Sequence, residues 1–212
     1  MADQLATTAQ VKARLQSSAG GVTFTAADDT LISELNDQVS DYIQHYTGRR
    51  LVAVGSATYI LDTTAGYVLR FPLGVRAVSA LAINTTAHQP DTGGTYTAVT
   101  ASNILLRPSP ADLPVGWPAT EIRLLRGNTQ NLIFGTIENG ASLTCTAGFA
   151  TTPPDIAGVA IDAIVAAFQN RKAGASGVIG ADGSPVIPWA NFFMKGSPQR
   201  ATLDRYRYPG FG

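Results

Sequence analysis

The chain has 212 residues, of which 45% are hydrophobic and only 14% are charged, and its formal net charge is zero. This length suits one large domain or two small ones with an ample apolar core. The low charge implies a surface rich in Thr, Ser, Asn and Gln, which suits a subunit covered by copies or partners, and the zero balance argues against a protein that wraps DNA by overall basic charge.

At the amino end, the spacing predicts a short helix over Thr7–Ser17, with Val11 and Leu15 turned inward. The first ten residues, MADQLATTAQ, lack a basic region followed by an apolar run, so we expect no signal peptide. No apolar stretch reaches about 20 residues, so we expect no membrane span. The expectation is cytoplasmic synthesis and a soluble product.

The strongest helical signal covers Asp28–Leu51. Asp28 and Asp29 are predicted as the N-cap and the first-turn anion, and Gly48 as the C-terminal cap. The apolar residues recur in steps of three and four on one face: Leu31, Ile32, Leu35, Val39, Ile43 and Tyr46. The opposite face is acidic through Glu34, Asp37 and Asp41.

Short strands follow between this helix and residue 152. Thr58–Asp62 and Tyr67–Phe71 flank the turn Thr63–Gly66, which predicts a hairpin. Pro72–Gly74 is predicted as a tight turn that leads into a further strand, Val75–Ile83. The remaining predicted strands are Tyr96–Thr100, Asn103–Arg107, and a closing pair formed by Thr120–Arg126 and Leu143–Phe149. Strands at this short spacing indicate an antiparallel sandwich or small barrel.

A second amphipathic helix is predicted over Asp155–Lys172, after Pro153 and Pro154. Small residues on its stripe (Ala160, Ala163, Ala167) allow another helix to approach closely. We therefore predict an α+β fold in which the two long helices clasp each other. Residues 1–51 and 153–172 form a helical base, residues 52–152 an inserted β domain, and residues 173–212 an extended docking tail.

The carboxyl end is basic and aromatic. Residues 171–212 carry a net charge of +4, while residues 1–51 and 52–170 each carry −2. A Gly/Ser/Pro loop is followed by the apolar cluster Trp189–Met194 and by a predicted short helix over Ser197–Tyr206. The cluster is either a satellite core or an intersubunit anchor, and the terminus RYRYPGFG is either a solvated tail or a docking tail.

Signals for catalysis are weak throughout. No phosphate-binding loop, zinc-protease motif or paired cysteine motif occurs, and His45 and His88 read as exposed polar residues. Asp91–Gly93 spells an aspartic-protease triplet but follows His88-Gln89-Pro90 rather than an apolar strand, which favours a turn. Cys145, the only cysteine, lies in an apolar run and reads as a buried small residue. We expect no enzymatic activity.

Three segments together resemble the head–tail connector (adaptor) proteins of tailed bacteriophages, prophages and gene transfer agents. They are Asp28–Leu51 with its Tyr46-Thr47-Gly48-Arg49-Arg50-Leu51 end, Leu61–Val78 with Arg70-Phe71-Pro72-Leu73, and Gly148–Arg171 with Pro153-Pro154-Asp155-Ile156. They occur in the right order and cover about a third of the chain, while residues 85–139 and the tail after Lys172 exceed the minimal family member.

The resemblance implies a virion protein of the neck, without enzymatic activity or cofactor. It implies a homo-oligomeric ring of about twelve copies that stacks under the portal protein, continues the channel for double-stranded DNA, and presents a lower face to a stopper or tail-completion protein. DNA would pass without sequence-specific binding, and no membrane would be involved.

Two sets of contact residues follow as hypotheses. Subunit contacts are expected at Glu34, Asp37, Asp41, Arg171, Lys172, Trp189, Phe192, Phe193 and Lys195. Portal docking is expected at Arg200, Arg205, Tyr206, Arg207, Tyr208 and Phe211. The alternatives are another virion structural subunit of the tail or capsid, and a β-domain binding module that uses Tyr59, Tyr67, Tyr96 and Trp117.

Overall fold

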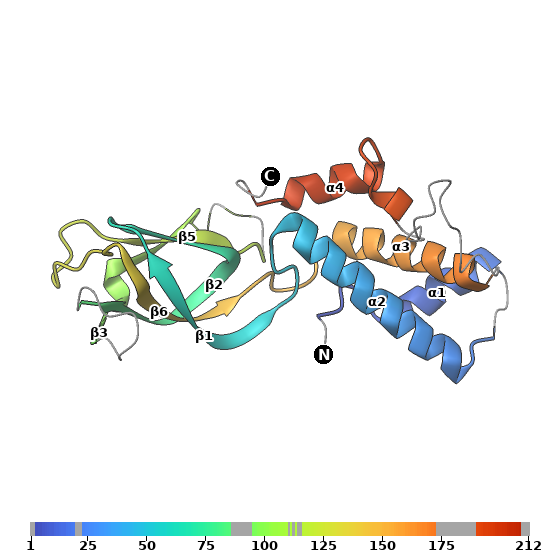
Figure 1. Cartoon of the computed structure of the whole chain (residues 1–212), viewed down its shortest axis with the longest axis horizontal. Coiled ribbons are helices and arrows are strands. Elements are labelled where there is room, and N and C mark those ends of the chain that lie inside the picture. The colour runs from blue at the N-terminus through green and yellow to red at the C-terminus, as the bar shows by residue number, and fades with distance from the viewer. Residues whose placement is uncertain are drawn as a thin grey trace. The chain divides into compact units, whose positions relative to one another are not determined.

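The computed structural model describes residues 3–19, 23–85, 95–109, 111, 113, 116–172 and 190–208. The chain divides into two compact units (Figure 1). The helical unit comprises Met1–Arg49 and Thr152–Gly212, and the sheet unit comprises Arg50–Thr151. Helices and one antiparallel sheet are thus segregated along the chain, which makes the fold α+β.

The helical unit is built on two long helices that pack against each other, α2 (Ala26–Thr47) and α3 (Pro154–Lys172), and the shorter α1 (Thr8–Ala19) and α4 (Pro198–Tyr206) each contact both of them. A 3₁₀ turn, Ala190–Phe193, precedes α4. The predicted stripes are buried as expected, with Ile32, Leu35, Val39 and Ile43 on α2 and Ile156, Ala160, Ala163, Ile164 and Ala167 on α3. The alanines of α3 permit the close approach that their spacing predicted.

The start of α2 differs from the sequence-based expectation. Thr25, not Asp28, is the N-cap, and the two residues form a reciprocal capping box. The Asp28 amide donates to Thr25 Oγ1 over 3.3 Å, and the Thr25 amide donates to Asp28 Oδ2 over 2.9 Å. Two otherwise unpaired backbone donors are satisfied in this way, which favours Thr25 over an aspartate three residues later. The helix ends as expected, with Gly48 in the left-handed region at φ 62°.

The sheet unit holds six strands in one antiparallel sheet of order β1-β6-β2-β5-β4, with β3 paired to β2. The strands are β1 (Val54–Thr63), β2 (Val68–Asn84), β3 (Tyr96–Ala98), β4 (Ile104–Arg107), β5 (Ala119–Leu124) and β6 (Ile137–Ala147). The described strands therefore belong to a single hydrogen-bonded sheet and not to the two sheets of a sandwich.

Three details of the predicted strand pairing are wrong. β1 and β2 do not form a hairpin, because β6 lies between them and its Leu143 pairs with both Tyr59 and Leu81. β5 and β6 are not neighbours either, because β2 separates them. The expected turn at Pro72–Gly74 lies inside β2, where the register of pairing is interrupted between Arg70 and Val75. Proline is tolerated there because the ladder is already interrupted, and Gly74 takes the positive φ of 84°.

The core of the sheet unit is formed by one face of these strands. Its largest fully buried side chains include Phe71, Leu81, Ile122, Phe134 and Leu143. Cys145 belongs to the same core and is fully buried, as its apolar neighbours predicted. On β5 the opposite face carries Glu121 and Arg123, in the alternation that an antiparallel sheet requires.

Candidate assembly surfaces

Helix α4 is seated in the helical unit by buried side chains. Leu203 and Tyr206 are buried, and the Tyr206 hydroxyl donates to the Asp155 carboxylate, with its oxygen 2.8 Å from Oδ1 and 3.0 Å from Oδ2. Burial, together with this carboxylate, raises the pKa of Tyr206 to about 12. Just beyond α4, the Tyr208 amide donates to the Thr47 carbonyl over 2.8 Å. Residues 198–208 are thus anchored on α2 and α3.

Tyr46 of α2 is the centre of an aromatic and arginine cluster. The guanidinium carbons of Arg200 and Arg207 lie 5.2 and 5.6 Å from the centre of its ring, and its hydroxyl donates to Asp204. Burial and the Asp204 carboxylate raise the pKa of Tyr46 above its ordinary value. Tyr42 stacks on Tyr46 at 6.4 Å and on Phe193 at 4.9 Å between ring centres. Cation–π and stacking contacts therefore hold the α4 segment against α2.

These contacts change the expectation for the predicted docking residues. Tyr206 has its ring and hydroxyl engaged inside the unit, so it positions α4 and cannot also present a free anchor without leaving its site. Arg200, Arg207 and Tyr208 are partly engaged on α2, whereas the side chain of Arg205 is exposed. Phe211 lies outside the described residues. The short helix predicted over Ser197–Tyr206 is confirmed as α4, and residues 198–206 pack on α2 and α3, so this part of the predicted tail is not extended.

The predicted acidic face of α2 exists as a surface. Glu34 and Asp41 are exposed, and Asp37 is half-buried and accepts a hydrogen bond of 2.9 Å from Gln4 Nε2. Neither Glu34 nor Asp41 is in an ion pair with another described residue. The face is therefore available for a cationic partner.

The predicted basic set is divided. Lys172 at the end of α3 lies 2.6 Å from Asp28 Oδ1, an ion pair that joins the carboxyl end of α3 to the amino end of α2. Lys172 and the hydrogen bonds from Thr25 lower the pKa of Asp28 to about 2. Arg171 is half-buried and Lys195 is exposed. The predicted apolar contacts are also partly internal: Phe193 is buried, Phe192 is half-buried, and Trp189 lies outside the described residues.

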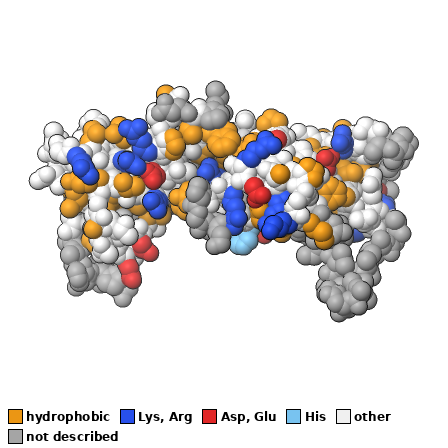
Figure 2. All heavy atoms as spheres, turned by 90° about the horizontal axis from the view of Figure 1, so that it is seen from above, with side chains coloured by type: hydrophobic (Ala, Val, Ile, Leu, Met, Phe, Trp, Pro, Cys, Tyr) orange, Lys and Arg blue, Asp and Glu red, His pale blue; other side chains and the backbone are white. Residues whose placement is uncertain are grey.

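The sheet unit carries a basic surface that the sequence analysis did not identify. Pairing places Arg70 of β2, Glu121 of β5 and Arg107 of β4 side by side across three strands, with Arg123 two residues further along β5 on the same face. We call Arg70, Arg107 and Arg123, with Glu121 between them, the arginine face. Figure 2 shows basic side chains gathered around an acidic one over the sheet.

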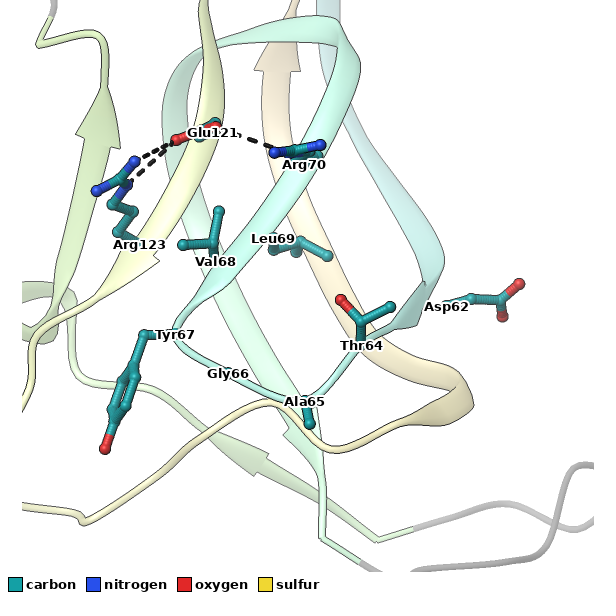
Figure 3. A pocket seen from close by; sticks show the side chains of 10 residues that line it. All are labelled: Asp62, Thr64, Ala65, Gly66, Tyr67, Val68, Leu69, Arg70, Glu121 and Arg123. Atoms are coloured by element: carbon teal, nitrogen blue, oxygen red, sulfur yellow. Dashed lines mark hydrogen bonds and ion pairs between the residues drawn. The ribbon is translucent and has the colours of Figure 1, made fainter. Parts of the chain in front are cut away.

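A hollow of about 620 Å³ lies beside the arginine face, lined by residues that include Asp62, Thr64 and Tyr67. Arg70 and Arg123 converge on Glu121 from two sides of its carboxylate (Figure 3). Arg123 donates to Glu121 Oε2 from Nε at 3.1 Å and from Nη2 at 2.8 Å, and Arg70 Nε lies 3.7 Å from Oε1. Arg70, Glu121 and Arg123 on one wall of the hollow are thus paired with each other, and the Asp62 carboxylate, which also lines it, accepts a hydrogen bond from the Asn139 amide.

Two clusters were therefore missed from sequence, for different reasons. The arginine face had a partial signal, since Glu121 and Arg123 alternate in the strand segment TEIRLLR. Its remaining members come from β2 and β4, and only the pairing of the strands brings them together. The Tyr46 cluster joins residues separated by more than 150 positions, and no local pattern predicts that contact.

The structure supplies little that resembles catalytic or membrane-spanning machinery. Among the described residues, no group of three or more His, Cys, Asp or Glu side chains is placed to hold a metal ion. Burial raises the pKa of Cys145 to about 11, which keeps its thiol protonated. No helix in the described part of the chain has the length and apolar character needed to cross a bilayer. His88, Asp91–Gly93 and the Gly-rich loop at residues 176–184 lie outside the described residues.

The four aromatics considered for a binding module are engaged within the sheet unit. Tyr59 packs on Phe71 at 4.9 Å between ring centres, and Trp117 packs on Phe149 at 5.3 Å. The Tyr96 hydroxyl donates to the Asn139 carbonyl over 2.8 Å, and the Arg126 guanidinium lies 5.6 Å from the centre of the Tyr67 ring. A stacking platform for a sugar needs free aromatic faces, so this arrangement does not favour that alternative.

Comparison with known proteins gives matches only at the level of structure. No family model matches the chain, and no curated protein matches it. A chain from the neck of an empty gene transfer agent (GTA) particle shares the fold with a TM-score of 0.51 and 21% identity, over 94% of this chain and 87% of that one. A chain from the virion of a native GTA particle gives 0.52 and 21%, over 93% and 88%. At this identity the likeness establishes a common fold.

Proposed function

We propose that the protein is a structural subunit of the neck of a tailed-phage-like particle, in the role of a head–tail adaptor. The observation that carries the proposal is the length of the shared fold: both units of this chain are matched, over 94% of its residues, by a chain whose structure is a GTA neck. The resemblance in Asp28–Leu51, Leu61–Val78 and Gly148–Arg171 supports the same assignment independently of the coordinates.

In this role the chain forms a ring of about twelve copies beneath the portal and above a stopper or tail-completion protein. The neck that shares the fold was determined with C6 symmetry, with which a twelve-membered ring is compatible. A ring requires two different complementary patches on each subunit. The acidic face of α2, with Glu34, Asp37 and Asp41, supplies one, and two basic residues of the same unit, the half-buried Arg171 and the exposed Lys195, supply the other.

Portal docking is assigned to the outer side of the α4 region. Arg205 is exposed on α4, and Arg200, Arg207 and Tyr208 belong to the same segment, with the two guanidinium groups over the Tyr46 ring. Figure 2 shows basic side chains grouped over α4. Tyr206 and Leu203 hold this segment against α2 and α3, so the arginines are presented on a packed helix and lose less conformational entropy on docking than a free tail does.

The same proposal assigns the protein no catalytic activity. In the sheet hollow, Arg70, Glu121 and Arg123 are paired with each other and Asp62 accepts a hydrogen bond from the Asn139 amide, while Cys145 is buried with a raised pKa. Neither arrangement offers a free nucleophile or base. Assembly contacts are the function that the remaining exposed charge supports best.

The test is electron microscopy of the purified chain mixed with the portal protein of the same particle. We expect a ring of this chain stacked on one end of the portal. Reversal of Arg205 to Glu is expected to weaken this complex at least tenfold, since it replaces an attraction with a repulsion. Lys12, which is paired with Asp29, provides the matched control as Lys12→Ala. A portal that remains bare at high protein concentration would refute the assignment.

A further inference from the structure

The arginine face is a cross-strand row of positive charge with one carboxylate beneath it. Arg70, Glu121 and Arg107 occupy directly opposed positions on β2, β5 and β4, and Val68, Arg123 and Leu105 form the next row on the same face. The intervening row, Leu69–Ile122–Leu106, points into the core. Adjacent strands lie about 4.8 Å apart, so the three guanidinium groups share a small area.

The exposure of each charged side chain decides whether the outermost charge of this surface is positive or negative. The Glu121 side chain is 23% exposed, whereas the side chains of Arg123 and Arg70 are 49% and 76% exposed. Arg107 is exposed as well and is in no ion pair with another described residue. The carboxylate thus lies below the guanidiniums and orients them, while the outermost charge is positive. Arg126 adds a further cation nearby, because its guanidinium lies over the ring of Tyr67, a residue that lines the hollow.

We propose that the arginine face of the sheet unit contacts the phosphodiester backbone of duplex DNA. The inference rests on the proposed function, in which DNA passes through the ring, and it names the surface of the subunit that meets it. Planar guanidinium groups match phosphate oxygens with two parallel hydrogen bonds, and the contact carries no sequence information. The adjacent hollow gives room beside the strands for a sugar-phosphate segment.

Glu121 weakens this contact because its carboxylate already binds two of the arginines. Each phosphate that pairs with Arg123 or Arg70 competes with a carboxylate already in place at 2.8 and 3.7 Å. Release of counterions from DNA favours binding, while the lost ion pair opposes it. DNA that moves through a channel needs contacts that exchange easily, and a face with its own internal counter-ion meets that requirement.

A protein partner is a poorer occupant for this face. Stable protein contacts are centred on buried aromatic or large apolar side chains. In the two rows described above, the only large exposed apolar side chain is Leu105, at 38% exposure, and no aromatic is present. A surface whose outermost charges are three guanidinium groups fits a polyanion better.

The test uses the full chain and a fluorescent duplex of about 30 base pairs, with binding followed by anisotropy between about 20 and 200 mM salt. We expect weak binding, and the logarithm of the association constant should fall linearly with the logarithm of the salt concentration. Arg107→Ala and Arg123→Ala should each reduce the slope by about 0.9 and the affinity several-fold at low salt. Arg123→Lys should retain the slope, and Arg14→Ala, an exposed arginine on α1 of the helical unit, is the matched control.

Glu121→Gln gives the most specific readout. It removes the competing carboxylate while preserving shape, so it should strengthen binding about three- to tenfold, a gain that misfolding cannot produce. Absence of salt-dependent binding by the wild type, or unchanged affinity in all of these variants, would overturn the inference. Loss of self-association in Arg123→Ala without any DNA binding would also overturn it and assign the face to a neighbouring copy. Ring formation on the portal is scored separately, so either proposal can fail alone.

Discussion

The two units differ in how their contacts are distributed along the chain. The helical unit is assembled from two distant segments, yet each of its helices is specified by signals within about 20 residues: periodic stripes, the Thr25–Asp28 capping box and the αL glycine at position 48. The sheet unit is continuous in sequence, yet its strands pair over long separations, as β1 does with β6. Local signals therefore identify the helices and the faces that they bury, whereas for the strands they identify the segments but not which strands pair.

Each unit has its own buried core, and truncating one buried side chain in each tests whether the two cores are independent. Leu143→Ala in the sheet and Ile43→Ala in α2 remove fully buried side chains, and each should lower the free energy of unfolding of its own unit by about 3 kcal/mol. Hydrogen exchange resolved by segment is the measurement. We expect each substitution to reduce protection in one unit only.

A loss of protection in both units would contradict this expectation. If either truncation reduced protection equally in α2–α3 and in β2–β6, the two units would unfold as one cooperative structure. The description of separate cores would then be wrong.

A smaller effect is expected where α4 is attached to the helical unit. Tyr206→Phe removes the hydrogen bond to Asp155 and should cost about 1.5 kcal/mol, because the bond is made to a charged, partly buried group. Tyr46→Phe is the matched control, since its hydroxyl meets Asp204 in an exposed position. We expect a clearly smaller loss for the control in urea unfolding followed by helical circular dichroism.

The Tyr206 hydroxyl also makes the stability of the helical unit depend on pH at alkaline pH. The pKa of Tyr206 is raised from 10.0 to about 12, so its contribution to stability is complete below pH 10 and is lost as pH rises towards 12. Wild type and Tyr206→Phe should therefore converge in stability over that window. A constant difference between them from pH 8 to about 12 would contradict the assigned hydrogen bond.

The smallest effect is expected at the acid side, at the junction of α2 and α3. The pKa of Asp28 is lowered from 3.8 to about 2 by Lys172 and Thr25, so its stabilising contribution is present above pH 3.8 and is lost as pH falls towards 2. Asp28→Asn keeps an N3 side chain that can accept a hydrogen bond but removes this titration. Acid unfolding of the variant should show a shallower dependence on pH between about 4 and 2. An identical profile would contradict the assigned ion pair.

The same contrast between the two units decides which features of the fold are predictable from sequence. The stripes of α2 and α3 and the cap at Gly48 were predicted correctly, because period and cap chemistry are local. The start of α2 was misplaced by three residues, since Thr25 and Asp28 both fit a cap and only the geometry decides. The hairpin between β1 and β2 was wrong because short loops favour adjacent pairing, whereas β6 inserts between them.

Residue type and spacing predicted some of the candidate surfaces but not others. The acidic face of α2 was predicted because Glu34, Asp37 and Asp41 recur at helical spacing. Lys172 looked equally available, but its partner Asp28 lies on another helix and could not be inferred. The arginine face needed the register of three strands, so sequence showed its members only as scattered charges.

The central claim, that this chain is a ring-forming adaptor of a particle neck, is tested most directly by counting its copies on the portal. Native mass spectrometry of the purified portal saturated with the full chain gives that count. The account predicts a single assembly carrying about twelve copies, as a closed ring of heterologous contacts requires. A portal that carries no copies, or an open series of adducts without a preferred number, would contradict it.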